Sequence, residues 1–240
     1  MEDTLIWRSS SRAHDWRTGA FLAHLLDAAA GEGLIGPTEW LERRLAGSRK
    51  AQRIEPGALA ERLMSTAEPS VRVLAAAGGS DPHPWSVSAV VFPWDDARGR
   101  AEGYSIITLE LDRAAGEGQA GSRRLRDAFL HAHDAGNTEA AYLHSFKRWD
   151  VLAAEVYLPP LVTVPTFAGV FWANFLGPGH LDQFDASRLG DLSASTVKWV
   201  DGGRGLFIIA TGEVAQSETA EGEAELRRLT EEMRAALRPE

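Results

Sequence analysis

Alternation of apolar and polar residues in two nearby stretches constrains the fold of this chain more than any other feature. Two serines alternate with apolar residues in the first stretch, and a threonine and a glutamate do so in the second. A period of two is typical of strands with one buried face. We therefore predict strands at residues 85–92 and 104–111, paired antiparallel in a half-buried sheet, with the intervening PWDDARGRAEG segment as a long hairpin loop.

Strands are predicted elsewhere as well. Residues 4–8 are short and β-prone, and residues 169–176 form an aromatic, β-prone run that ends in the sequence GPG. Residues 196–200 and 205–210 are predicted to form a second hairpin, because Asp-Gly-Gly at the turn is a favourable connection. Residues 139–160 are ambiguous, and one interpretation is a helix followed by a strand at 154–158.

Helices are indicated where apolar residues recur at spacings of three and four. The first runs from Asp15, a plausible N-cap, to the glycines at 31 and 33, and another follows Ser122, which could cap it. The stretches 75–84 and 113–121 have loop composition. The remaining helices are predicted at 38–45, at 56–64, at 180–189 and in a charged C-terminal segment whose apolar stripe is Leu226, Leu229, Met233, Ala236 and Leu237.

This order of elements predicts the fold class. Strands and helices alternate from residue 4 to residue 210 without a long linker or an internal repeat. The simplest account is one α+β domain over residues 1–240, with a mostly antiparallel sheet and helices packed against it. An apolar content of 44% and a charged content of 25% are those of an ordinary soluble globular protein.

Charge and cysteine content narrow the function. The chain has no cysteine, which excludes disulfides, thiolate catalysis and zinc sites built on cysteine. Its formal net charge of −9 disfavours binding to nucleic acid, and it either steers a basic partner toward the protein or only keeps the protein soluble. The N-terminal sequence lacks a secretory signal, and no apolar run is long enough to span a bilayer. We expect a cytoplasmic protein that is not inserted in a membrane.

Motifs for catalysis are absent from the sequence. His131, His133 and His144 are close in sequence, but residues two apart on a helix diverge by about 200°, and no HExxH motif is present. Neither a G-x-S-x-G nucleophile elbow nor a phosphate-binding glycine loop occurs. We therefore expect no metal, no cofactor and no catalytic residues. A hydrolase site assembled from these histidines with Asp134 or Asp150 stays open as an alternative.

Tryptophan and paired aspartates mark the predicted hairpin loop. Trp94, Asp95 and Asp96 stand together there, either as a solvated loop or as a contact point for a basic partner. An aromatic ring beside carboxylates is a good interface anchor. Two carboxylates alone are weak evidence for a cation site. We predict that Trp94 is exposed, whereas Trp7, Trp172 and Trp199, in predicted strands, pack in the core or on the sheet.

Motifs along the whole chain resemble those of the immunity protein 52 family. The run VFWANFLGPGHLDQF, followed by VKWVDGGRGLFIIAT, is similar to the C-terminal half of that family. The N-terminal half adds an aromatic strand at Trp7, an amphipathic helix, and a tryptophan before a basic segment. At the first long strand, however, this chain has Phe-Pro-Trp-Asp where the family has Trp-Asn-Gly. The matching residues, which suit structural roles, are Trp7, Trp172, Asn174, Gly177, Pro178, Asp201, Gly202 and Gly203.

The resemblance implies a non-catalytic protein that binds and neutralises a cognate bacterial toxin by occlusion. Such a protein needs no cofactor. Its partner would be a toxin, with the carboxylates of this chain complementing a basic surface. Two alternatives remain at this point. One is the hydrolase described above, and the other is a module of a defence system that binds a protein other than a toxin.

Overall fold

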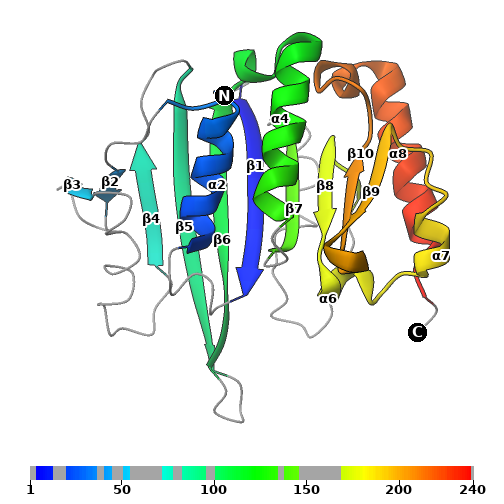
Figure 1. The fold of residues 1–240 in the computed structure, drawn as a ribbon, viewed down its shortest axis with the longest axis horizontal. Coiled ribbons are helices and arrows are strands. Elements are labelled where there is room, and N and C mark those ends of the chain that lie inside the picture. The colour runs from blue at the N-terminus through cyan, green and yellow to red at the C-terminus, as the bar shows by residue number, and fades with distance from the viewer. Residues whose placement is uncertain are drawn as a thin grey trace.

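A computed structural model of the chain describes residues 4–12, 20–36, 41–44, 51–54, 72–77, 83–95, 101–134, 138–145 and 169–238. All strands in these ranges belong to one sheet, whose order is β3-β2-β4-β5-β6-β1-β7-β8-β10-β9 (Figure 1). Every neighbouring pair is antiparallel. The strands are β1 (Thr4–Arg12), β2 (Leu41–Arg44), β3 (Ala51–Ile54), β4 (Arg72–Ala77), β5 (Trp85–Asp95), β6 (Ala101–Asp112), β7 (Thr138–Ser145), β8 (Ala173–Leu176), β9 (Thr196–Val200) and β10 (Gly205–Ile209).

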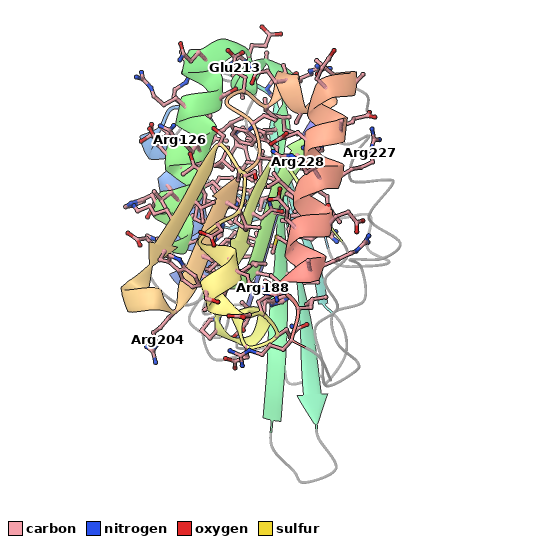
Figure 2. The ribbon with its side chains drawn as sticks, turned by 90° about the vertical axis from the view of Figure 1, so that its right-hand side faces the viewer. Arg126, Arg188, Arg204, Glu213, Arg227 and Arg228 are labelled. Carbon is pink, nitrogen blue, oxygen red and sulfur yellow. The ribbon has the colours of Figure 1, made fainter. Side chains whose placement is uncertain are left out.

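Helices cover both faces of this sheet. Helices α2 and α4 lie side by side on one face, and α8 lies on the other face beside β8, β9 and β10 (Figures 1 and 2). The predicted α+β class, with a mostly antiparallel sheet and packed helices, is confirmed. The helices are α2 (Ala20–Gly31), α4 (Gly118–His133), α6 (Pro178–Leu181), α7 (Ala186–Leu189) and α8 (Ala220–Ala235), with short 3-10 turns η1 (Arg113–Gly116), η2 (Asp201–Gly203) and η3 (Ala215–Glu218).

The core has two parts, one on each face. In β10, Phe207 and Ile209 join the cluster beneath α2 and α4, whereas Leu206 and Ile208 join the cluster beneath α8. That second cluster includes every residue of the predicted C-terminal stripe except Leu237, which follows α8 and is exposed. All residues of β8 and β10 are buried. Because both faces of these strands are covered, β10 is a continuous apolar run, and β8 has a single polar residue, the buried Asn174.

Three predictions of local structure were wrong or incomplete. Residues 41–44 form β2 where a helix was predicted, and the predicted loop at 75–84 overlaps the end of β4. The alanines of β4 have low strand propensity, but pairing with β5 at six positions outweighs it. The first described element in the ambiguous 139–160 stretch is the strand β7. The predicted helix at 56–64 and strand at 154–158 lie outside the described residues.

Helix boundaries also differ from the prediction. Helix α4 begins at Gly118, so Ser122 lies inside the helix and is not its cap. The Ser122 hydroxyl donates to the Gly116 carbonyl at 3.1 Å and accepts from the Val214 amide at 3.1 Å, which ties α4 to two loops. The predicted helix at 180–189 is two short helices, α6 and α7. None of the described helices has the length and apolar content that a membrane crossing requires.

Candidate interaction site

The β5–β6 hairpin extends past its neighbours and forms a two-stranded arm. These two strands pair from Trp85↔Leu111 to Asp95↔Ala101. On one side β4 pairs with β5 only as far as Val91, and on the other side β1 pairs with β6 only as far as Tyr104. Residues 92–95 and 101–103 therefore have no flanking strand within the described part of the chain. Figure 1 shows the hairpin projecting beyond the rest of the sheet.

Two of the three predicted contact residues lie in this arm. Trp94 is opposite Glu102, and Asp95 is opposite Ala101. Both residues were predicted in a polar loop, and that prediction is wrong because β5 continues through Asp95. Pro93 is compatible with this extension, since β4 has already ended and proline is tolerated where a strand lies at an edge. Asp96 lies outside the described residues.

Register determines which residues of the arm share a face. Residues that are opposite each other in an antiparallel pair lie on the same face, as do residues two apart in one strand. Phe92, Trp94, Glu102 and Tyr104 therefore occupy register positions that belong to one face of the hairpin. This face combines three aromatic residues with a carboxylate, which is a composition suited to an interface anchor.

The root of the arm is anchored in the core. Trp85, Val87, Leu109 and Leu111 are all buried, in the cluster that α2 and α4 cover. A rigidly held root limits the entropy that the hairpin loses when a partner binds. The arm is thus a projecting element on a fixed base.

The three histidines of the alternative hydrolase site do not come together. His131 is exposed on α4, with its ring 5.2 Å from that of His24 on α2. His133 packs against Trp7, whereas His144 is opposite Ile6, the residue that precedes Trp7. Because successive residues of a strand point to opposite faces, His133 and His144 lie on opposite sides of the sheet. Among the described residues, no three acidic or histidine side chains gather as a metal-binding group.

His133 instead belongs to a buried polar network that the sequence did not reveal. Its Nε2 atom lies 3.1 Å from Trp7 Nε1 and 3.3 Å from Ser9 Oγ, and its Nδ1 atom lies 2.8 Å from Thr138 Oγ1. Since the indole can only donate, Nε2 accepts and Nδ1 carries the proton that is donated to Thr138. Burial, and to a lesser extent the charge of His24, lowers the pKa of His133 to about 3.

This network offers no support for hydrolysis. Ser9 and His133 have exposed fractions of 0% and 1%, so a substrate could not reach the Ser9 hydroxyl without opening the core. Asp134, one of the proposed partners of the histidines, is exposed at the end of α4. Asp150, the other, lies outside the described residues. The one indication in the sequence was that Trp7 and Ser9 are two residues apart in a predicted strand and therefore lie on the same face.

The residues of the family motif hold backbone segments in place. Trp7 and Trp172 are completely buried. The Asn174 side chain accepts from the Phe171 amide at 2.8 Å and donates to the Phe171 carbonyl at 2.9 Å, which closes the bend before β8. The Trp172 indole donates to the Thr211 carbonyl at 3.1 Å.

The glycines and proline of the motif act through backbone geometry. A Cβ atom at Gly177 would lie 2.2 Å from the Thr138 carbonyl oxygen, so only glycine lets β8 approach β7 there. Pro178 opens α6 at the position where a helix tolerates it. Asp201 begins the turn between β9 and β10, in which Gly202 and Gly203 have φ values of 63° and 96°, a region that favours glycine.

Trp199 differs from the two buried tryptophans. It lies on the sheet, in β9 as predicted, but 37% of its surface is exposed, so it is not a core residue. The reason is its position, since β9 is the last strand in the sheet order and has a neighbour only on one side in the described structure.

Comparison with known proteins bears on the fold. No protein-family model and no curated protein matches the chain. Among solved structures, a Pseudomonas aeruginosa T6SS protein, PA0821, is similar with a TM-score of 0.64 and 15% sequence identity, over 97% of this chain and 73% of that chain. At this level of identity the likeness shows the fold alone. The resemblance to the immunity protein 52 family stays a prediction.

Proposed function

We propose that this chain is an immunity protein that binds a cognate bacterial toxin and neutralises it by occlusion, as in the immunity protein 52 family that its motifs resemble. The observation that carries the proposal is the likeness in fold, over 97% of the chain, to a T6SS protein. On this proposal the chain acts in the cytoplasm, uses no cofactor and catalyses no reaction. Its partner is a basic toxin, and neither nucleic acid nor a membrane is bound.

The β5–β6 arm supplies the contact in this proposal. Its aromatic residues can enter a pocket of the toxin and bury a large area at low entropic cost, as interface anchors do. The acidic balance of the whole chain, −9, raises the rate of encounter with a basic surface. Anchor residues and long-range charge thus have separate effects, the first on dissociation and the second on association.

The test is co-expression with the protein encoded beside this chain. The expected result is that the neighbouring protein arrests growth when produced alone, that this chain restores growth, and that the two proteins purify as a complex. Replacing Trp94→Ala is expected to weaken binding at least about 30-fold, as the loss of an anchor worth about 2 kcal/mol would. Asp95→Lys is expected mainly to slow association and to reduce its dependence on salt.

Matched controls separate the arm from the rest of the surface. Leu237→Ala removes an exposed apolar side chain near the C-terminus, and Asp191→Lys makes the same charge change as Asp95→Lys in an exposed turn after α7. Both variants should bind normally. Tight binding to a neighbour that is harmless would instead favour a module with a partner other than a toxin. A toxic neighbour that neither binds nor is neutralised would refute the proposal.

A further inference from the structure

Strand β9 is an open edge of the sheet. It is the last strand in the order and pairs only with β10 in the part of the chain that the structure describes. Figure 2 looks onto this edge, with α4 on one side and α8 on the other. It is separated from β6, and so from the β5–β6 arm, by β1, β7, β8 and β10. A partner bound to β9 would therefore occupy a different surface from the one assigned to the toxin.

The hydrogen-bond pattern shows which backbone groups of β9 face outward. The Gly177 amide donates to the Glu139 carbonyl at 2.9 Å, toward β7. By alternation, Leu176 and Asn174 of β8 bond toward β10, where they are opposite Leu206 and Ile208. The Ala210 amide likewise donates to the Trp172 carbonyl at 2.9 Å, toward β8, although the Ala210 carbonyl, past the end of β10, accepts from Ser195. Because the direction alternates along an antiparallel strand, the preceding residue of β10, Ile209, bonds toward β9, where it is opposite Thr196. By the same alternation Val197 and Trp199 direct their N–H and C=O groups away from β10. A short row of backbone donors and acceptors therefore faces outward.

The side chains of this edge are open to a partner. Lys198 and Trp199 are both exposed, and Val197 is partly buried against the cluster beneath α8. Arg204 projects from the turn that follows β9 (Figure 2). Neither Lys198 nor Arg204 has an ion pair within the described residues. In contrast, Arg228 of α8 bonds to Glu225 and Glu232. Two cations that form no ion pair with any described residue therefore lie along and just beyond the edge strand.

We propose that β9 accepts an extended, acidic segment of a protein partner as an additional strand of the sheet. The outward N–H and C=O groups of Val197 and Trp199 would bond to the backbone of that segment. An acidic residue opposite Lys198 is favoured because opposite charges across a strand pair attract. A lysine on an edge strand also opposes indiscriminate pairing. If two copies of β9 paired antiparallel about Lys198, the two lysines would lie opposite each other and repel, which disfavours self-pairing.

The test uses a cyclised β-hairpin peptide whose free edge has the sequence Thr-Val-Glu-Val-Thr, together with a second peptide in which lysine replaces the glutamate. Cyclisation removes most of the entropy that a linear peptide would lose on binding. We expect the glutamate peptide to slow hydrogen exchange at the Val197 and Trp199 amides. Its affinity should exceed that of the lysine peptide by roughly tenfold, since one attractive pair becomes repulsive.

Two variants make the test specific to the edge. Val197→Pro removes an outward N–H group without removing a bond to β10, because the amide of Val197 faces away from that strand. It should abolish binding while circular dichroism shows an intact fold. Lys198→Glu should reverse the preference, so that the lysine peptide binds better.

Three results would overturn the inference. The first is the absence of protection at Val197 and Trp199 with either peptide at millimolar concentration. The second is equal affinity for the two peptides. The third is a concentration-dependent dimer in which these amides are already protected, which would make a second copy the occupant. None of these measurements involves the toxin, so failure here is distinguishable from failure of the proposed function.

Discussion

Acidification should destabilise this protein through a single buried histidine. The imidazole of His133 is 1% exposed and has a pKa of about 3 in the folded protein, against about 6.5 when the chain is unfolded. Below pH 6.5 the unfolded chain gains a proton at this residue that the folded protein excludes. The contribution of the neutral His133 side chain to the free energy of unfolding is therefore fully present above about pH 6.5, and it is lost as the pH falls toward 3.

The magnitude follows from the difference in proton binding. One pH unit corresponds to about 1.36 kcal/mol, so between about pH 8 and about pH 5.5 His133 alone should lower the free energy of unfolding by about 1.4 kcal/mol. The assay is urea denaturation at these two values, for the parent chain and for His133→Gln. On acidification, the free energy of unfolding of the variant should fall by about 1.4 kcal/mol less than that of the parent, because the variant lacks His133 and keeps the other titrating groups.

A matched control and a direct measurement complete this prediction. His131→Gln makes the same substitution at an exposed position two residues away on α4 and controls for the replacement of a histidine by glutamine as such. Titration of the His133 ring by NMR should show no protonation down to about pH 4. Equal pH dependence in the parent and His133→Gln, or a His133 pKa near 6.5, would refute the reasoning.

Two further predictions concern backbone positions. Gly222→Ala would place a Cβ atom 1.9 Å from the Gln216 carbonyl oxygen, so it should lower the free energy of unfolding by more than about 2 kcal/mol despite the higher helix propensity of alanine. A Cβ atom at Gly202 would have no atom within 4 Å, so Gly202→Ala should lower the free energy of unfolding by only about 1 kcal/mol, the cost of a left-handed backbone for alanine. Thermal melts of both variants would test this difference. Asn174→Ala removes the two hydrogen bonds that the Asn174 side chain makes to the Phe171 backbone. It should lower the free energy of unfolding by about 1–3 kcal/mol in total, measured by urea denaturation, and no measurable loss would contradict this expectation.

The amino-acid sequence alone determined those elements whose pattern is local. Alternating residues predicted β5 and β6, a stripe at helical spacing predicted α8, and Asp-Gly-Gly predicted the β9–β10 turn. In each of these cases the periodicity reports which side of an element is buried, and the turn residues report a backbone conformation that only they adopt readily. Such information is contained within about ten neighbouring residues.

Only the tertiary structure decided the features that depend on distant partners. Strand β4 ends in three alanines, and these residues form a strand because β5 pairs with them. The residues Ser9, His133 and Thr138 form a network because β1, α4 and β7 meet in the core, although up to 129 positions separate the first from the last. The extent of the β5–β6 arm depends on where β1 and β4 end, and the exposure of Trp199 depends on β9 being an edge. The sequence of a strand indicates that it has a buried face, but the number of neighbours it finds is a property of the whole sheet.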